Sequence, residues 1–106
     1  MQDRRQFTRH PIYVAVSISS EDNTDRAGIS RDISAGGLLF HSSTRFAVGE
    51  YVEVRFRIAR ADDARATGQV VRASRDPDAE TVFRNITAVA FAFPVAPELR
   101  AALSFT

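Results

Sequence analysis

Apolar and polar residues alternate along much of the chain, with the period of two that is typical of half-buried β-strands. In residues 12–18 every second residue is valine or isoleucine. Residues 52–58 repeat this pattern more regularly, and charged residues fill the alternate positions. Both segments are therefore predicted to be strands that bury one face in a core and expose the other.

Four further segments complete a predicted set of six strands. They are residues 26–33, 38–41, 68–73 and 86–93. In the last of them, Val89, Phe91 and Phe93 are expected to share one face. The stretches Ser34-Ala35-Gly36-Gly37 and Asp76-Pro77-Asp78 have the composition of turns between strands.

A short helical pattern begins at Pro97 and extends over residues 98–105, with Leu99 and Leu103 as its main apolar positions. Six closely spaced strands followed by one helix are typical of a small barrel, which leaves no open sheet edge when it closes. The predicted fold is therefore all-β, a six-stranded antiparallel β-barrel with a short C-terminal helix. We expect this helix to lie across one barrel mouth or to contact a partner.

The composition is that of one ordinary globular domain. The chain has 106 residues, of which 44% are hydrophobic and 25% are charged, and it has no cysteine. Disulfides, thiolate nucleophiles and sulfur-ligated zinc are thereby excluded. No apolar run approaches the ~18 residues that a membrane span needs, and no signal-peptide pattern opens the sequence. We therefore expect a cytoplasmic protein with no membrane partner.

The net charge of +1 does not indicate a general polyanion binder. All 14 basic residues are arginine, which codon usage in a GC-rich genome explains, so only the positions of the arginines bear on function. Three of them lie in residues 1–11, a segment too polar to bury itself and therefore expected to be flexible. Residues 12–106 are the predicted barrel domain with its terminal helix.

The arginine motif of this N-terminal segment is Arg4-Arg5-x-x-x-Arg9. Its side chains can converge on one small anion, because a guanidinium presents a planar fork of donors suited to phosphate or to the O6/N7 edge of guanine. The structural alternative is a solvated basic tail.

A second motif, Asp32-x-Ser34-x-Gly36-Gly37, has the composition of a sharp turn between strands. A carboxylate and a hydroxyl two residues apart in an extended segment also project from one side, and glycine lets a planar ligand approach the backbone. A carboxylate accepts from the N1–H and N2–H₂ edge of guanine, which arginine cannot do. The motif therefore fits either a plain turn or half of a guanine site.

Taken together, the two motifs and the strand order resemble the PilZ domain family over nearly the whole chain. Arg5-x-x-x-Arg9 comes just before the first strand, Asp32-x-Ser34-x-x-Gly37 lies between the second and third, and Val89-x-Phe91 precedes the terminal helix. The resemblance implies a barrel that binds the bacterial second messenger cyclic di-GMP, with no catalysis and no separate cofactor. The chain departs from the family at Ala88, where many members have glycine, and in the shortness of its helix.

For the N-terminal segment, the resemblance implies that Arg5 and Arg9 wrap over the ligand and contact phosphate and the Hoogsteen edge of guanine. Arg4 lies at the position where a basic residue is associated in this family with a stacked, intercalated ligand dimer. Ordering of the segment on binding would relay the signal to an unidentified downstream protein. For the barrel, Asp32 and Ser34 would hold the Watson–Crick side of a guanine or the nearby ribose. Gly37 would allow close approach at the turn, with Gly36 beside it in the same site.

Three other functions are compatible with parts of this sequence. Asp32, Ser34 and His41 supply the residue types of a hydrolase triad, but Asp32 and Ser34 are too close in sequence to flank an imidazole, and two histidines make no metal site. A barrel for single-stranded nucleic acid would expose several aromatics, whereas only Phe7 and Tyr13 are expected to be free, so nucleic acid is not an expected partner. A PilZ-like barrel that binds protein alone would typically lack the arginine motif.

Overall fold

The computed structural model of the chain describes residues 10–11, 13–34, 36–57 and 64–93. The strands are β1 (His10–Pro11), β2 (Ala15–Ser19), β3 (Arg26–Ile33), β4 (Gly37–Ser42), β5 (Tyr51–Phe56), β6 (Ala64–Arg75) and β7 (Asn85–Phe91). The helix predicted over residues 98–105 and the arginine motif both lie outside the described residues. Within the described part of the chain, no helix is long and apolar enough to cross a membrane.

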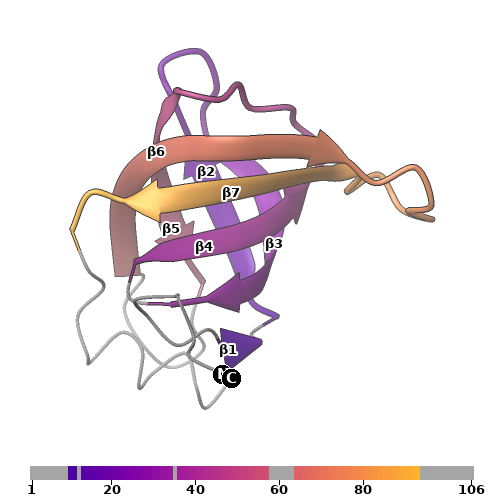
Figure 1. Ribbon diagram of the computed structural model, residues 1–106, viewed down its shortest axis with the longest axis horizontal. Helices are drawn as coiled ribbons and strands as arrows, with labels where there is room; N and C mark the ends of the chain where they lie inside the picture. The colour runs from indigo at the N-terminus through magenta and orange to yellow at the C-terminus, as the bar shows by residue number, and fades with distance from the viewer. Residues whose placement is uncertain (1–9, 12, 35, 58–63, 94–106) are drawn as a thin grey trace, which may run out of the picture.

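The strands form one antiparallel sheet that closes on itself (Figure 1). The order is β1-β3-β2-β5-β6-β7-β4, and a further pairing of β3 with β4 joins the ends of the six longer strands into a ring. β1 and β2 pair with different parts of β3, along the same edge. The predicted six-stranded antiparallel barrel is therefore confirmed, with β1 as a short addition.

Strand boundaries differ from the prediction at both ends of the chain. The first predicted strand, residues 12–18, corresponds to β2, and β1 lies in the segment predicted to be flexible. β6 spans 12 residues and bends around the barrel, because its first half pairs with β5 and its second half with β7 (Figure 1). β7 ends at Phe91, so the side chain of Phe93 does not share its inward face.

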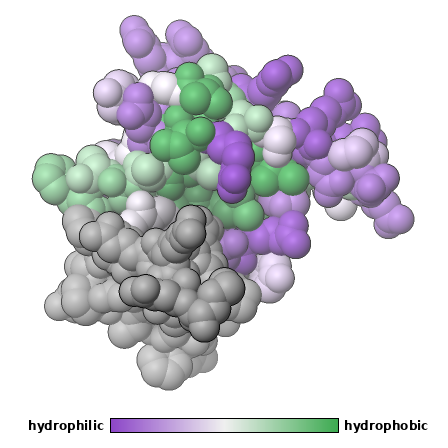
Figure 2. All heavy atoms as spheres, viewed as in Figure 1, coloured by the Kyte–Doolittle hydropathy of each residue, from purple (hydrophilic) through white to green (hydrophobic). Residues whose placement is uncertain are grey.

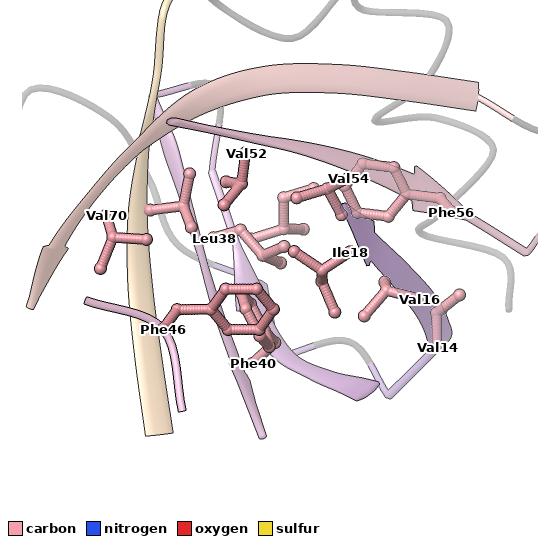
Figure 3. Close-up of a cluster of buried hydrophobic side chains, with 12 residues drawn as sticks. Val14, Val16, Ile18, Leu38, Phe40, Phe46, Val52, Val54, Phe56 and Val70 are labelled. Atoms are coloured by element: carbon pink, nitrogen blue, oxygen red, sulfur yellow. The ribbon is translucent and has the colours of Figure 1, made fainter. Parts of the chain in front are cut away.

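Alternate residues of the strands fill the barrel with apolar side chains (Figure 3). The buried members are Val14, Val16, Ile18, Ile33, Leu38, Phe40, Phe46, Val52, Val54, Phe56, Val70 and Val89. Phe46, from the loop after β4, packs edge-to-face on Phe40 with ring centroids 5.9 Å apart. The core therefore consists mainly of the apolar positions that the alternating pattern predicts.

Aromatic exposure departs from the expectation. Tyr13 is exposed as predicted, but Tyr51 and Phe93 are also exposed, at 74% and 77%. Tyr51 starts β5 one residue before the inward-facing Val52, and Phe93 lies beyond the end of β7. The prediction that these two rings face the core or its edge is wrong. Tyr51 is on the outer side of the β5 alternation, with Glu53 and Arg55, and Phe93 follows the end of β7, which the alternation does not mark.

Candidate functional site

Asp32 lies on the outer face of β3 because of a β-bulge. The register between β3 and β4 shifts between Ser30 and Asp32, which leaves Arg31 as the extra residue. Ser30 and Ile33 are buried, whereas Asp32 is partly exposed. Strict alternation from Ser30 would turn Asp32 toward the core, so the bulge is what gives its carboxylate access to the surface.

The Ser30 hydroxyl maintains backbone pairing beside this bulge. Its Oγ accepts a hydrogen bond from the Val14 amide at 2.9 Å, and the Ser30 amide donates to the Val14 carbonyl at 2.8 Å. Both residues are buried, where an unpaired amide would be costly. The Ser30 side chain thus takes the place of a ladder carbonyl on the edge of β3 between β1 and β2, beside the bulge.

Ser34 begins the tight turn from β3 to β4. Its amide donates to the Gly37 carbonyl at 2.9 Å, and its Oγ accepts from the Gly36 amide at 3.3 Å. The residue is buried, unlike Asp32. The turn chemistry predicted for this motif is therefore present. The bond to Gly36 does not use the hydroxyl proton, so Ser34 can still donate to a ligand.

The glycines of this turn pack against β7. Gly37 is paired with Ala90, and a Cβ at Gly37 would lie 2.7 Å from the Val89 carbonyl oxygen. The Gly36 carbonyl accepts from the Phe91 amide at 2.9 Å. The close approach of β7 therefore explains why residue 37 is a glycine. This reason is separate from the ligand access that the sequence predicts.

β1 is the end of residues 1–11, which we call the arginine segment, and it lies beside the Asp32 motif. Pro11 is opposite Asp32 in the pairing of β1 with β3. His10, the first residue of β1, directly follows Arg9 in the sequence. Arg4, Arg5 and Arg9 lie outside the described residues, so their contacts stay predictions.

A row of outward-facing residues crosses the barrel from Asp32. Asp32 on β3 is opposite Leu39 on β4, and Leu39 is opposite Ala88 on β7. Ala88 is in turn opposite Arg72 on β6. Leu39 and Ala88 are partly buried and Arg72 is exposed. Because neighbouring strands are about 4.8 Å apart, Arg72 lies about 14 Å from Asp32 along the surface.

Arg72 is a candidate site residue that the sequence analysis missed. A second bulge, between Val70 and Arg72, leaves Val71 out of the pairing with β7. Val70 is buried, whereas Val71 and Arg72 are both exposed. The two adjacent valines, which interrupt the alternation, were the signal in the sequence that could have indicated this bulge.

The described residues do not assemble a hydrolase triad. His41 is opposite Ile29, and its Nε2 lies 3.2 Å from the Nη1 of Arg31. The Ser34 hydroxyl accepts from a backbone amide of its own turn instead. Across the described ranges, no three histidine, aspartate or glutamate side chains gather as metal ligands.

Residues 3–104 match the family model of the PilZ domain, a range that includes the arginine motif as well as the barrel. Among solved structures, the Bacillus subtilis inhibitor of motility MotI/DgrA is 22% identical, with a TM-score of 0.73. That match covers 98% of this chain and 50% of the other. The PilZ domain with c-di-GMP of YcgR from Escherichia coli is 20% identical, with a TM-score of 0.68 and coverage of 96% and 87%.

A structure of YcgR from Escherichia coli in complex with c-di-GMP is 16% identical, with a TM-score of 0.61. That match covers 97% of this chain and 44% of the YcgR chain. The chain thus spans about half the length of MotI/DgrA and less than half the length of this YcgR. These likenesses show that the fold is shared. No curated protein matches the chain.

Proposed function

Since the PilZ family model matches nearly all of its residues, the chain belongs to the PilZ domain family, and on this premise we propose that it is a non-catalytic receptor for cyclic di-GMP. The observation that carries the proposal is the pairing of Pro11 with Asp32, which joins the end of the arginine segment to the Asp32 motif. Cyclic di-GMP has two phosphates and two guanines, so its receptor needs both cationic donors and an acceptor for a guanine edge. YcgR, which has the same fold, is described in complex with c-di-GMP.

The arginine segment supplies the cationic donors in this proposal. Arg9 is bonded to His10 at the start of β1, and Arg5 is at most about 14 Å further along an extended chain. Both guanidinium groups can therefore reach a ligand seated beside Asp32, where a bidentate contact to phosphate or to guanine O6/N7 has the matching geometry.

The outer face of the barrel supplies the rest of the proposed site. The Asp32 carboxylate accepts from the N1–H and N2–H₂ edge of a guanine, and Ser34 holds the same edge or the ribose. Leu39 and Ala88 form an apolar floor for a base. Arg72, at the other end of this row, contacts the second half of the ligand.

Binding orders the N-terminal segment and so changes the surface that the barrel presents to a downstream protein. The ordering costs conformational entropy, which the contacts of the arginines with the ligand offset. Arg4 adds a third guanidinium to those of Arg5 and Arg9. With this additional cation, we expect the ligand to bind as an intercalated dimer.

Isothermal titration calorimetry of the protein with cyclic di-GMP, with GTP as the control ligand, tests the proposal. Saturable heat with cyclic di-GMP alone is expected, and a stoichiometry of two ligands per chain is the signature of the dimer. Absence of heat, with the β-sheet circular dichroism spectrum intact, would contradict the receptor function. In that case a protein-binding barrel would be the better assignment.

A further inference from the structure

A hollow of about 340 Å³ opens at the end of the barrel where β4 and β6 end and β7 begins. Its polar lining consists of Ser43, Arg45, Ser74, Arg75, Arg84 and Asn85, and we refer to it as the arginine hollow. Every one of these side chains can donate a hydrogen bond, and none is a carboxylate. The arginine hollow therefore has the chemistry of an anion site.

The strand register explains why arginines from different segments meet here. Asn85 is opposite Ser42 on one side and Arg75 on the other. Ser42 is fully buried, so this row faces inward and ends at the barrel mouth, whereas the row from Asp32 to Arg72 faces outward. Three residues along each strand, about 10 Å, separate the two rows. The arginine hollow is thus distinct from the proposed cyclic di-GMP site.

The cations of the arginine hollow are accessible. Arg45, Arg75 and Arg84 are all exposed. Within the described part of the chain, no ion pair or hydrogen bond engages the guanidinium of Arg45 or Arg75. Arg84 donates from Nε to the Thr81 carbonyl at 3.2 Å, which holds its side chain at the base of the β6–β7 hairpin. Two of the three guanidinium groups therefore lack a partner among these residues.

The charged residues of the β6–β7 hairpin line two different hollows. Arg75 and Arg84 line the arginine hollow, whereas Asp76 and Glu80 line a second hollow on the outer side of β3 and β4, which also has Arg31 in its lining. Figure 2 shows hydrophilic residues gathered where the hairpin extends at the right of the view. A nucleic acid, with one charge per ~1.7 Å of duplex, would extend past the arginine hollow toward these carboxylates and be repelled. A short acidic segment needs to cover only the arginine hollow.

We propose that the arginine hollow docks a short acidic segment of a partner protein. Guanidinium groups pair with carboxylates in bidentate geometry, and the serine and asparagine side chains add neutral donors. Val82, which also lines the hollow and is 72% exposed, gives an apolar side chain of the same segment a surface to cover. This partner site is separate from the nucleotide site, so it is expected whether or not cyclic di-GMP binds.

The test is a titration of ¹⁵N-labelled protein with a short peptide of alternating glutamate and leucine. The matched probe replaces each glutamate with glutamine, and a single-stranded oligothymidylate and inorganic pyrophosphate distinguish the other anion classes. We expect amide shifts in residues 43–45, 74–75 and 82–85 with the acidic peptide only. Substitution of Arg45→Gln together with Arg75→Gln should weaken binding about three- to tenfold.

Arg65→Gln is the matched control, because Arg65 is another exposed arginine of β6 and lies outside the arginine hollow. It should leave the peptide affinity unchanged. Equal affinity of the parent and the Arg45→Gln/Arg75→Gln variant would overturn the proposal, provided that both melt at the same temperature. Three other results would also overturn the proposal. They are amide shifts located elsewhere, no binding of the acidic peptide, and tighter binding of oligothymidylate or pyrophosphate at this hollow.

Discussion

Asp32 on β3 and Arg72 on β6 face outward in one cross-strand row, and each follows directly on a β-bulge. The bulge residues, Arg31 and Val71, shift the alternation so that the next side chain leaves the core side of its strand. The two residues are three strand spacings apart, about 14 Å along the surface between their backbones. They therefore bracket a partly buried floor of Leu39 and Ala88, which is an arrangement suited to an extended ligand with two unlike ends.

This relationship predicts that Asp32→Asn and Arg72→Gln each weaken cyclic di-GMP binding, independently of the other. Loss of the Asp32 acceptor should cost about 1–3 kcal/mol, and loss of the more exposed Arg72 about 1 kcal/mol. Since the proposal has the two residues contact opposite halves of the ligand and not each other, their effects should add in the double variant. Calorimetric titration measures all four affinities, with Arg65→Gln as the control. An unchanged affinity of Arg72→Gln would remove Arg72 from the proposed site.

Arg5→Ala or Arg9→Ala should abolish measurable binding of cyclic di-GMP. Each variant removes a guanidinium that the proposal places on the phosphates, while the barrel core stays as it is. The melting temperature of the free protein is therefore expected to change little. Calorimetry and thermal unfolding followed by circular dichroism check the two halves of this prediction. Retained affinity in both variants would show that the segment is a solvated tail.

Ser30→Ala should destabilise the barrel by about 1–3 kcal/mol. The substitution leaves the buried Val14 amide without the Oγ that accepts its hydrogen bond. Chemical denaturation measures the free energy of unfolding, with Ser74→Ala on an exposed position of β6 as the control. If the two variants were equally stable, the hydroxyl would not be what maintains the pairing beside the bulge.

Thr87→Val should stabilise the protein, by about 1 kcal/mol. Thr87 is 1% exposed, and its Oγ1 finds no hydrogen-bond partner within the described ranges. Valine has the same shape without the unsatisfied hydroxyl, so the cost of burying that group is removed. A rise in Tm of about 4 °C is expected in thermal unfolding. Thr67→Val, at an exposed position of the sheet, should change Tm far less. A lower Tm for Thr87→Val would mean that the hydroxyl is satisfied.

Gly37→Ala should destabilise the turn beside Asp32 by about 1–3 kcal/mol. The new Cβ would meet the Val89 carbonyl oxygen at 2.7 Å, so β7 must move away from β4. Hydrogen exchange of the Phe91 amide, which donates to Gly36, should become faster. Gly49→Ala is the contrast, because Gly49 has a φ of 94° and open space around its Cβ position. Its cost arises from the backbone alone and should leave exchange at Phe91 unchanged.

By itself, the sequence determined the six longer strands, most of the core and the residue types of the candidate site. The alternation through Val14, Val16 and Ile18 is a local property with the period of a strand, so it predicts which side chains are buried without knowledge of their neighbours. The Asp32 motif was likewise identifiable, because a turn and a guanine-edge acceptor both depend on residue type at short spacing.

Only the tertiary structure decided which strands lie side by side, because pairing joins residues that are distant in sequence. It placed Pro11 opposite Asp32, and it brought Arg72 into the same row through two other strands. It also showed that β7 ends at Phe91, which leaves Phe93 exposed, because the alternating pattern does not mark where a strand ends. Register and bulges are set by hydrogen bonding between strands, and so the outer face that forms the proposed site follows from the closed barrel rather than from any one segment.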